Sequence, residues 1–263
     1  MSVSIRLSIY WPESQQDEKP EETDTIVITT PSGKHIDIRS YKTEVFSNKN
    51  SLRQFPFQWA FAGNELPVKD HPSQVQFSHD FFDSSYILEY CKAKKAAQRV
   101  LPSKSDIQID CGTFKTLEDG VREETGRMRN EETGRIEPYI EHWLTLDPIR
   151  STPNRIVPLK PGRSEYAFDY ALFDIIENTQ NFEGRFIRLG VWAEGLLWDK
   201  SNLDSPISVV RLHFENEEWR AIISFGDGVH YFHSLTLEKV ESGDTIKNSE
   251  VIWVCLEKGA VKP

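Results

Sequence analysis

The stretch Phe55-Pro-Phe-Gln-Trp-Ala-Phe-Ala-Gly63 decides the fold, because aromatic residues recur at every second position. Successive side chains of a β-strand point to opposite faces. The pattern therefore predicts a strand with one aromatic face, formed by Phe55, Phe57, Trp59 and Phe61. Exposed aromatic rings are unfavourable in water, so something must cover this face. It is either packed as a core or barrel interior, or it is the wall of a ligand pocket.

Short alternating runs fill the rest of the chain and indicate an all-β protein. Residues 3–11 alternate apolar and polar side chains, as a half-buried strand does. Residues 25–30 and 35–40 are typical of a hairpin joined by Pro31-Ser32-Gly33-Lys34. In residues 85–100 a strand running into a helical turn is expected. We predict an all-β fold of mainly antiparallel strands, as in sandwiches and barrels.

A proline cluster divides the chain near its middle. The prolines of this cluster are Pro148, Pro153, Pro158 and Pro161. A short echo suggests two related halves, because Trp59-Ala-Phe-Ala-Gly63 in the first resembles Trp192-Ala-Glu-Gly195 in the second. We predict two tandem antiparallel β-barrel domains, residues 1–147 and 148–263, since closing a sheet into a barrel removes its edges.

The second copy of the echo contains charged residues. Residues 185–198 are predicted to form one strand that is buried on both sides, because apolar residues occur on both faces. In that register Arg188 and Glu194 share a face with Trp192. This is either a pocket with an ion pair, or a salt bridge at a domain interface with Arg188 reaching toward solvent. The candidate ligand-binding residues are therefore Phe57, Trp59, Phe61, Arg188, Trp192 and Glu194.

Two charged segments are expected to be exposed. Glu123-Glu-Thr-Gly-Arg127 recurs as Glu131-Glu-Thr-Gly-Arg135, and its charges and glycines predict an exposed hairpin or loop. The segment from Pro12 to Asp24 contains six acidic residues and one lysine, which predicts a solvated loop.

The overall charge argues against several classes of partner. The 263 residues include 31 Lys and Arg against 41 Asp and Glu, a net charge of −10. Neither half has a basic surface for nucleic acid or for anionic lipid. No N-terminal signal and no membrane-spanning run are expected. The spacing of Cys91, Cys111 and Cys255 fits neither a disulfide framework nor a zinc module, which favours reduced thiols in the cytosol or nucleus.

No catalytic pattern is evident in the sequence. It lacks a nucleophile elbow, a phosphate-binding glycine loop and a zinc-protease motif. His230 and His233 are three residues apart, which on a strand puts them on opposite faces. Nothing in the sequence brings Cys111 close to His142, so an inert buried thiol is the simpler interpretation. We predict no catalytic residue, no metal and no cofactor.

A family resemblance rests on five motifs taken in order. These are Phe55-Pro-Phe-Gln-Trp-Ala-Phe-Ala-Gly63, Glu123-Glu-Thr-Gly126, Glu141-His-Trp143, Asp147-Pro148 and Gly190-Val-Trp-Ala-Glu-Gly195. In them the chain resembles the fungal Hri proteins, which are named for interaction with a type I casein kinase. The resemblance implies two β-barrel-like, somewhat lipocalin-like domains in a protein of the cytoplasm and nucleus. It implies no catalytic residue and no cofactor.

The sequence therefore allows two functions. The first is a non-enzymatic interaction protein whose acidic surface meets a casein kinase I-type protein kinase. The alternative is a lipocalin-like carrier that holds a small apolar ligand inside one barrel, against aromatic walls. An enzyme on the same scaffold has no site in the sequence to support it.

Overall fold

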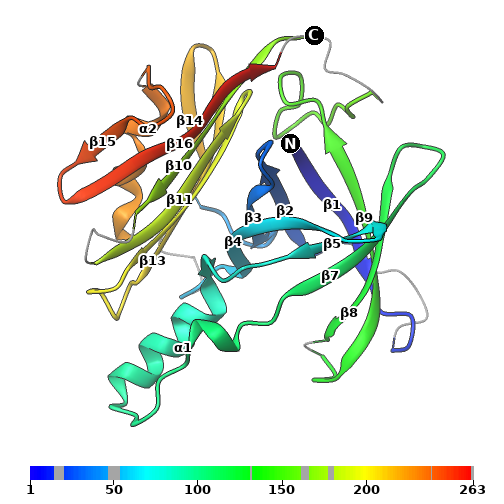
Figure 1. Ribbon diagram of the computed structural model, residues 1–263, viewed down its shortest axis with the longest axis horizontal. Coiled ribbons are helices and arrows are strands. Elements are labelled where there is room, and N and C mark those ends of the chain that lie inside the picture. Colours follow the sequence, from blue (N-terminus) through cyan, green and yellow to red (C-terminus); the bar gives the residue numbers. More distant parts are fainter. Residues whose placement is uncertain are drawn as a thin grey trace.

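The computed structural model folds the chain into two antiparallel β-sheets that lie side by side (Figure 1). It describes residues 1–14, 21–46, 54–130, 132–160, 166–176, 181–237 and 239–261. All strands of the first sheet come from residues 2–146, and all strands of the second come from residues 168–261. The prediction of an all-β, antiparallel protein is confirmed.

The first sheet closes into an eight-stranded antiparallel barrel. Its strands are β1 (Ser2–Tyr10), β2 (Thr23–Thr29), β3 (Lys34–Tyr41), β4 (Phe57–Val68), β5 (His71–Phe77), β7 (Asp110–Thr116), β8 (Arg122–Arg129) and β9 (Ile136–Leu146). Pairing of β3 with β4 joins the two ends of the sheet, and β6 (Phe82–Asp83) adds a short strand to β4. The hairpin predicted for residues 25–40 is present as β2 and β3.

Helix α1 (Ser84–Lys95) lies at the lower edge of the barrel in Figure 1. The Asp83 carboxylate caps it by accepting a hydrogen bond of 3.0 Å from the Tyr86 amide. Ile87 and Cys91 are four residues apart, share one helix face and are both buried. The strand expected at the start of residues 85–100 is therefore wrong, because burial there follows the helical period. No helix in the described ranges is long and apolar enough to cross a membrane.

The second sheet remains open. Its strands are β10 (Phe168–Ile175), β11 (Phe182–Leu189), β12 (Trp192–Asp199), β13 (Ile207–Glu215), β14 (Glu218–Phe225), β15 (Thr245–Asn248) and β16 (Val251–Val261). Strands β14 and β15 form its two edges and do not pair with each other, so the second of the two predicted barrels is not confirmed. The barrel covers one face of this sheet. The helical turns η3 (Asp227–Phe232) and α2 (Ser234–Leu237) pack on the other, so its apolar surface is buried without closure.

Residues 185–198 form a hairpin of β11 and β12, and not the single strand that was predicted. The first strand ends at Leu189 and the second begins at Trp192. Gly190 makes the turn possible, because its φ is +60° and a Cβ there would lie 2.3 Å from the Pro148 carbonyl oxygen. The expected burial on both faces is confirmed, since all of β12 except its last residue is buried.

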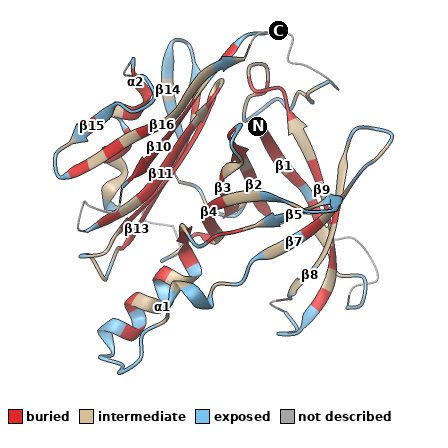
Figure 2. Cartoon of the chain, viewed as in Figure 1, coloured by how far each residue is buried: buried red, intermediate tan, exposed pale blue. Residues whose placement is uncertain are grey.

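The larger apolar core lies between the two sheets, where the buried strands of Figure 2 face each other. The barrel contributes outward-facing residues of β1 to β4: Val3, Ile26, Ile28, Ile36, Ile38, Phe57, Ala60 and Ala62. The second sheet contributes Leu172, Ile187, Leu189, Trp192, Leu196, Trp198, Ile207, Val209 and Ile223. This wall of the barrel is therefore covered on its outer face by protein.

A β-bulge splits the aromatic stretch between two faces. Trp59 pairs with Arg39, but the next pair along β3 takes Phe57, which leaves Gln58 as an extra residue. Phe57 joins the core between the sheets, whereas Trp59 and Phe61 point into the barrel beside Arg39. The prediction of one shared aromatic face is wrong, because the bulge breaks the period of two between Phe57 and Trp59.

Candidate functional site

The barrel interior is lined largely by polar side chains. The inward-facing residues of β2 and β3 are Thr23, Thr25, Val27, Thr29, His35, Asp37 and Arg39. Their outward-facing neighbours are Ile26, Ile28, Ile36 and Ile38. Because the second sheet packs on the outer wall, the apolar face of these strands is the outer one and the polar face is enclosed. The barrel interior is the candidate functional site.

Two hollows occupy this interior. The smaller, of about 80 Å³, is lined by aromatic rings and carboxylates from six of the barrel strands. The larger, of about 1130 Å³, extends to the exposed residues Ile109 and Ile136. Arg39 and Asp110 border both. A site for one water needs about 10–15 Å³ on the same measure, so the barrel is not packed solid with side chains.

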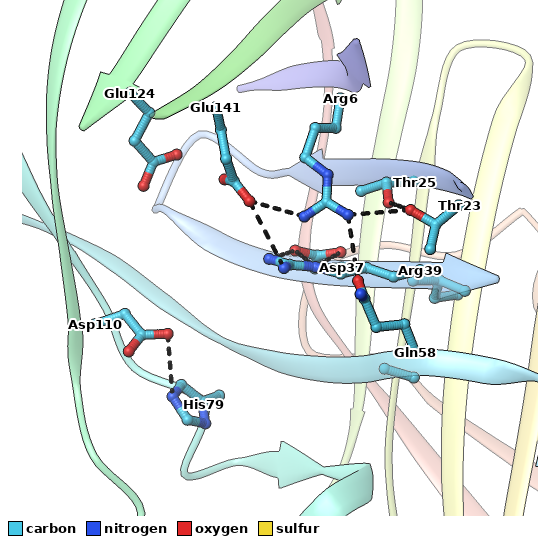
Figure 3. A network of polar contacts seen from close by, with 12 residues as sticks. Arg6, Thr23, Thr25, Asp37, Arg39, Gln58, His79, Asp110, Glu124 and Glu141 are labelled. Atoms are coloured by element: carbon cyan, nitrogen blue, oxygen red, sulfur yellow. Dashed lines mark hydrogen bonds and ion pairs between the residues drawn. The ribbon is translucent and has the colours of Figure 1, made fainter. Parts of the chain in front are cut away.

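Arg6 on β1 holds one side of the interior together (Figure 3). Its Nη1 donates to Glu141 Oε1 at 2.7 Å, and its Nε donates to Glu21 Oε2 at 2.7 Å. Its Nη2 donates to Thr23 Oγ1 and Gln58 Oε1 at 3.1 and 3.2 Å. Burial opposes ionisation of Glu21, but Arg6 lowers the pKa of that carboxyl below its usual value. The expectation of a solvated acidic loop is therefore wrong at Glu21; residues 15–20 lie outside the described residues.

Arg39 on β3 lies at the centre of the interior. Its Nε and Nη2 donate to the Asp37 carboxylate at 3.0 and 2.8 Å, and its Nη1 lies 3.9 Å from Glu141 Oε1. The guanidinium carbon is 5.2 Å from the Trp59 ring centroid and 5.3 Å from that of Phe61. Although burial opposes its charge, the nearby carboxylates of Asp37 and Glu141 raise the pKa of Arg39. A fixed positive charge with aromatic neighbours results.

A second ionic group consists of His79, which follows β5, Asp83 of β6 and Asp110 at the start of β7. His79 Nδ1 lies 2.7 Å from Asp83 Oδ2, and its Nε2 lies 3.7 Å from Asp110 Oδ2 (Figure 3). The imidazole packs edge-on against Trp59 and Phe61, with ring centroids 4.9 and 5.5 Å away. Burial raises the pKa of Asp110, and His79 opposes that change. Asp83 thus both caps α1 and orients His79.

Glu124 on β8 is a buried carboxyl group with a hydroxyl as its partner. It accepts a hydrogen bond of 2.8 Å from the Tyr139 hydroxyl and is 5% exposed. Burial, followed by repulsion from Glu141, raises its pKa to about 8. A Cβ at Gly112 would lie 2.3 Å from Glu124 Oε1, so the missing side chain at that position makes room for the carboxyl group.

The segment around Glu124 corrects the prediction of an exposed loop. Residues 123–127 lie within β8, where their side chains alternate between the interior and the outer surface. The second copy of the motif forms the exposed turn that was expected over residues 132–135, and Glu131 lies outside the described residues. The two copies of the motif therefore have different environments. The first copy lies in β8, which pairs with β7 and β9 within the barrel, whereas the second copy forms a turn.

Four side chains in the interior have buried ring nitrogens without a hydrogen-bond partner among the described residues: His35, Trp59, His79 (at Nε2) and Trp143. Neither ring nitrogen of His35 lies in hydrogen-bonding geometry with another described residue, and the side chain is 1% exposed. Burial and the nearby positive charge of Arg185 lower the pKa of His35 to about 3, so the imidazole is neutral. The indole N–H of Trp59 is also buried and has no acceptor among the described residues. Buried polar atoms of this kind are uncommon in folded proteins.

The expected pocket around Arg188 does not form. The β11–β12 register pairs Arg188 with Ala193, which puts Arg188 and Glu194 on opposite faces of the sheet. Arg188 Nη1 donates to the Thr236 carbonyl oxygen at 3.0 Å, on the face away from the barrel. Trp192 is fully buried in the core between the sheets. Of the six candidate residues, Trp59 and Phe61 therefore lie in the barrel interior.

Glu194 pairs instead with Arg211. Arg211 Nε donates to Glu194 Oε1 at 2.7 Å, and both side chains are fully buried. Arg211 also reaches the barrel, donating to Asp24 Oδ2 at 3.0 Å and to the Ile38 carbonyl oxygen at 2.8 Å. Burial opposes its charge, but Asp24 and Glu194 raise the pKa of Arg211. The alternative of a salt bridge at an interface holds for Glu194, with a different arginine.

Sequence reasoning missed most of the residues that line the interior. They are Arg6, His35, Asp37, Arg39, His79, Asp110, Glu124 and Glu141. A signal was present in residues 25–40, where isoleucines alternate with threonines and charged residues. Such a period of two distinguishes two faces but does not say which is enclosed. Within the described residues, no three His, Cys, Asp or Glu side chains are arranged to hold a metal ion.

Comparison with known proteins agrees with this architecture. The crystal structure of the uncharacterized protein YLR301w from Saccharomyces cerevisiae is similar, with a TM-score of 0.74, 19% sequence identity and coverage of 98% of both chains. Protein HRI1 of Candida glabrata is 27% identical over 92% of this chain and 94% of its own length. Protein HRI1 of Saccharomyces cerevisiae is 24% identical over 90% of this chain and 92% of its own. A family model described as Protein HRI1 matches residues 2–257, and the chain therefore belongs to the HRI1 family.

Proposed function

We propose that this chain is a non-enzymatic binding protein whose barrel holds a small polar molecule. The observation that carries the proposal is the hollow, charged interior, in which buried ionic groups surround space that protein atoms do not fill. Ligand sites commonly combine aromatic walls with a few polar groups in fixed positions. Here Trp59 and Phe61 supply walls, while Arg39 and His35 supply fixed polar groups.

The polarity of the interior changes the expected chemistry of the ligand. A wholly apolar molecule would take water away from Glu124 and His35 without offering them a hydrogen bond, which is unfavourable. A ligand with its own polar groups would meet those atoms. We therefore propose a polar ligand in place of the apolar one that the aromatic stretch alone suggested.

The pairing of the ionic groups favours binding over catalysis. Arg6 is held by Glu21 and Glu141, and Arg39 is held by Asp37. A catalytic acid or base needs access to the reacting atom, whereas these groups already satisfy each other. Their arrangement is that of a rigid, preorganised lining, which supports a protein that binds and does not transform its ligand.

A binding experiment with a blocking variant tests the proposal. A library of small polar molecules is screened by NMR, and ligands are expected to shift amides of β3, β4 and β7 to β9. Val75 lines the smaller hollow, so Val75→Phe should fill it and remove the shifts. Leu66→Phe is the matched control, because Leu66 is on an adjacent strand but exposed, and it should leave them unchanged.

Thermal denaturation followed by circular dichroism checks that both variants are folded, and both should melt within a few degrees of the parent protein. Native mass spectrometry of the freshly purified chain adds a second measurement. The proposal is wrong if no co-purifying mass is found and no library member shifts the interior amides.

A second candidate is the binding of a casein kinase I-type protein kinase. It is supported by the family resemblance and by the net charge of −10, which would attract a basic surface and speed encounter. A protein with that partner would work in the cytoplasm and nucleus. Pull-down with recombinant kinase at moderate salt should exceed the binding of an unrelated acidic β-barrel, and equal binding would reject it.

A further inference from the structure

We infer that the smaller cavity of the barrel takes a small organic cation, a protonated amine, which sits between Glu124, His35 and the aromatic walls. This inference rests on the proposed function, that the barrel binds a small molecule, and it names the class of that molecule. It follows from an inventory of the charges around the cavity, from the side chains that lack partners and from the available volume.

The carboxylates around the cavity fall into two groups. Asp37 and Glu141 are each bound by an arginine, at 2.8 and 2.7 Å. Among the described residues, Glu124, Asp110 and Glu65 have no arginine or lysine within salt-bridge distance; Asp110 is 3.7 Å from His79, and Glu65 accepts a hydrogen bond from Thr29. A buried carboxylate without a cation is unfavourable, so a positively charged ligand would supply the missing counter-ion.

Glu124 occupies a central position in this cavity. It lies directly across from Phe114 on β7 and from Glu141 on β9, so the three side chains form one row on the inner surface. The Tyr139 hydroxyl bonds to one of its two carboxylate oxygens, Oε1. An ammonium group bound here would offset the repulsion from Glu141 that the ionised form of Glu124 would otherwise meet.

The walls of the cavity suit an organic cation. Its aromatic lining consists of Phe61, Phe77, Phe114, Tyr139 and Trp143. Ring faces attract positive charge, and the chain already uses this contact, because the Arg122 guanidinium carbon lies 4.2 Å from the Phe114 ring centroid. Alkyl carbons of an amine would pack on the remaining rings while its nitrogen reaches Glu124.

His35 supplies the complementary acceptor. Its imidazole lines the same cavity, is 1% exposed and has no partner for either nitrogen among the described residues. A neutral imidazole has one nitrogen with a free lone pair, which can accept an N–H from an ammonium group. An unpartnered, buried acceptor in the same cavity as a carboxyl group without a cation is thus the second observation that points to a hydrogen-bond donor carrying positive charge.

The volume limits the size of the cation. About 80 Å³ corresponds to roughly five to eight water sites. A short alkylamine of about four carbon atoms is of this size. Larger ligands would have to extend past Arg39 and Asp110 into the second hollow.

Binding should release a proton from Glu124. Since its pKa is about 8, most of the carboxyl groups are protonated at neutral pH, and a cation prefers the ionised form. Affinity should therefore rise with pH, by up to about tenfold per unit below pH 8. The other charged and titratable groups that face this cavity are Arg6, His35, Asp37, Arg39, Glu65, Asp110, Arg122, Tyr139 and Glu141.

The test compares three molecules of one shape and different charge: n-butylamine, 1-butanol and butyrate. NMR titration at neutral pH is expected to give at least about tenfold tighter binding for the amine, with shifts in β3 and β7 to β9. Calorimetry in two buffers of different ionisation enthalpy should show release of about one proton per amine bound.

Glu124→Gln is the decisive variant, since it keeps the shape and the Tyr139 hydrogen bond but cannot ionise. It should weaken amine binding by about tenfold or more and abolish proton release. Glu123→Gln is its control, because Glu123 lies next in sequence on the opposite face, and it should change affinity less than about twofold.

The outcomes separate the two proposals. Equal or tighter binding of butanol or butyrate would overturn the cation inference and leave the barrel as a binding site. Equal amine binding by Glu124→Gln and the parent protein would overturn it as well. If none of the three molecules shifts the interior amides and the polar library also fails, both the inference and the proposed function are rejected.

Discussion

Replacing Arg211 with alanine should lower the free energy of unfolding by about 3–5 kcal/mol. The guanidinium is fully buried and bonds to Glu194 on its own sheet and to Asp24 and Ile38 on the barrel. Its removal leaves the Glu194 carboxylate buried without a cation and leaves the Ile38 carbonyl without this donor. Urea denaturation at neutral pH, followed by tryptophan fluorescence, measures the change.

Two further variants show whether the effect comes from the buried charge. Arg220 pairs with Glu215 at 3.1 Å on the exposed surface, so Arg220→Ala should cost less than about 1 kcal/mol. Removing both buried charges, with Arg211→Met and Glu194→Leu together, should destabilise less than Arg211→Ala alone. If Arg211→Ala costs no more than Arg220→Ala, the Arg211 guanidinium does not hold the two sheets together.

Gly63→Ala should be comparably severe, with a loss of more than about 3 kcal/mol or failure to fold. A Cβ at this position would lie 1.7 Å from the Ser78 carbonyl oxygen, which belongs to the backbone and cannot rotate away. The Gly63 carbonyl oxygen also accepts a hydrogen bond of 2.6 Å from Arg185 Nη1 of the second sheet. A displacement of β4 would therefore disturb both the barrel and its contact with that sheet.

Gly120→Ala is the control for this substitution. Gly120 has a φ of +86°, and a Cβ there would meet nothing within 4 Å. The strain of that backbone conformation alone should cost about 1–2 kcal/mol. Thermal denaturation of both variants separates backbone strain from steric overlap. A Gly63→Ala protein as stable as Gly120→Ala would show that β4 and Ser78 can move apart.

The alternating pattern of the sequence predicted some strands and faces correctly and others wrongly. Alternation identified the strands β1 to β3 and placed Trp59 and Phe61 together correctly. It failed at Phe57, because a β-bulge is a property of the pairing between two strands and has no mark in the bulged strand itself. It also failed for Arg188, because a turn at Gly190 reverses which residues share a face.

The charged lining of the barrel depended on contacts distant in sequence. Arg6 binds Glu141, which is 135 residues away, and Arg211 binds Asp24, which is 187 residues away. Many acidic residues are available to each arginine in a chain with 41 of them. Closure of the barrel and docking of the second sheet select the partners, so pairing could not be derived from the sequence.

The sequence by itself determined that this protein is all-β, that its strands have two chemically distinct faces and that its charge is acidic. Only the tertiary structure decided which face is enclosed. Local alternation sorts Ile26 and Ile28 from Thr25 and Thr29, but both faces of a strand can be buried when a second sheet covers the outer one. That covering places the isoleucines outside the barrel and the polar side chains within it, and thereby gives the barrel a polar interior.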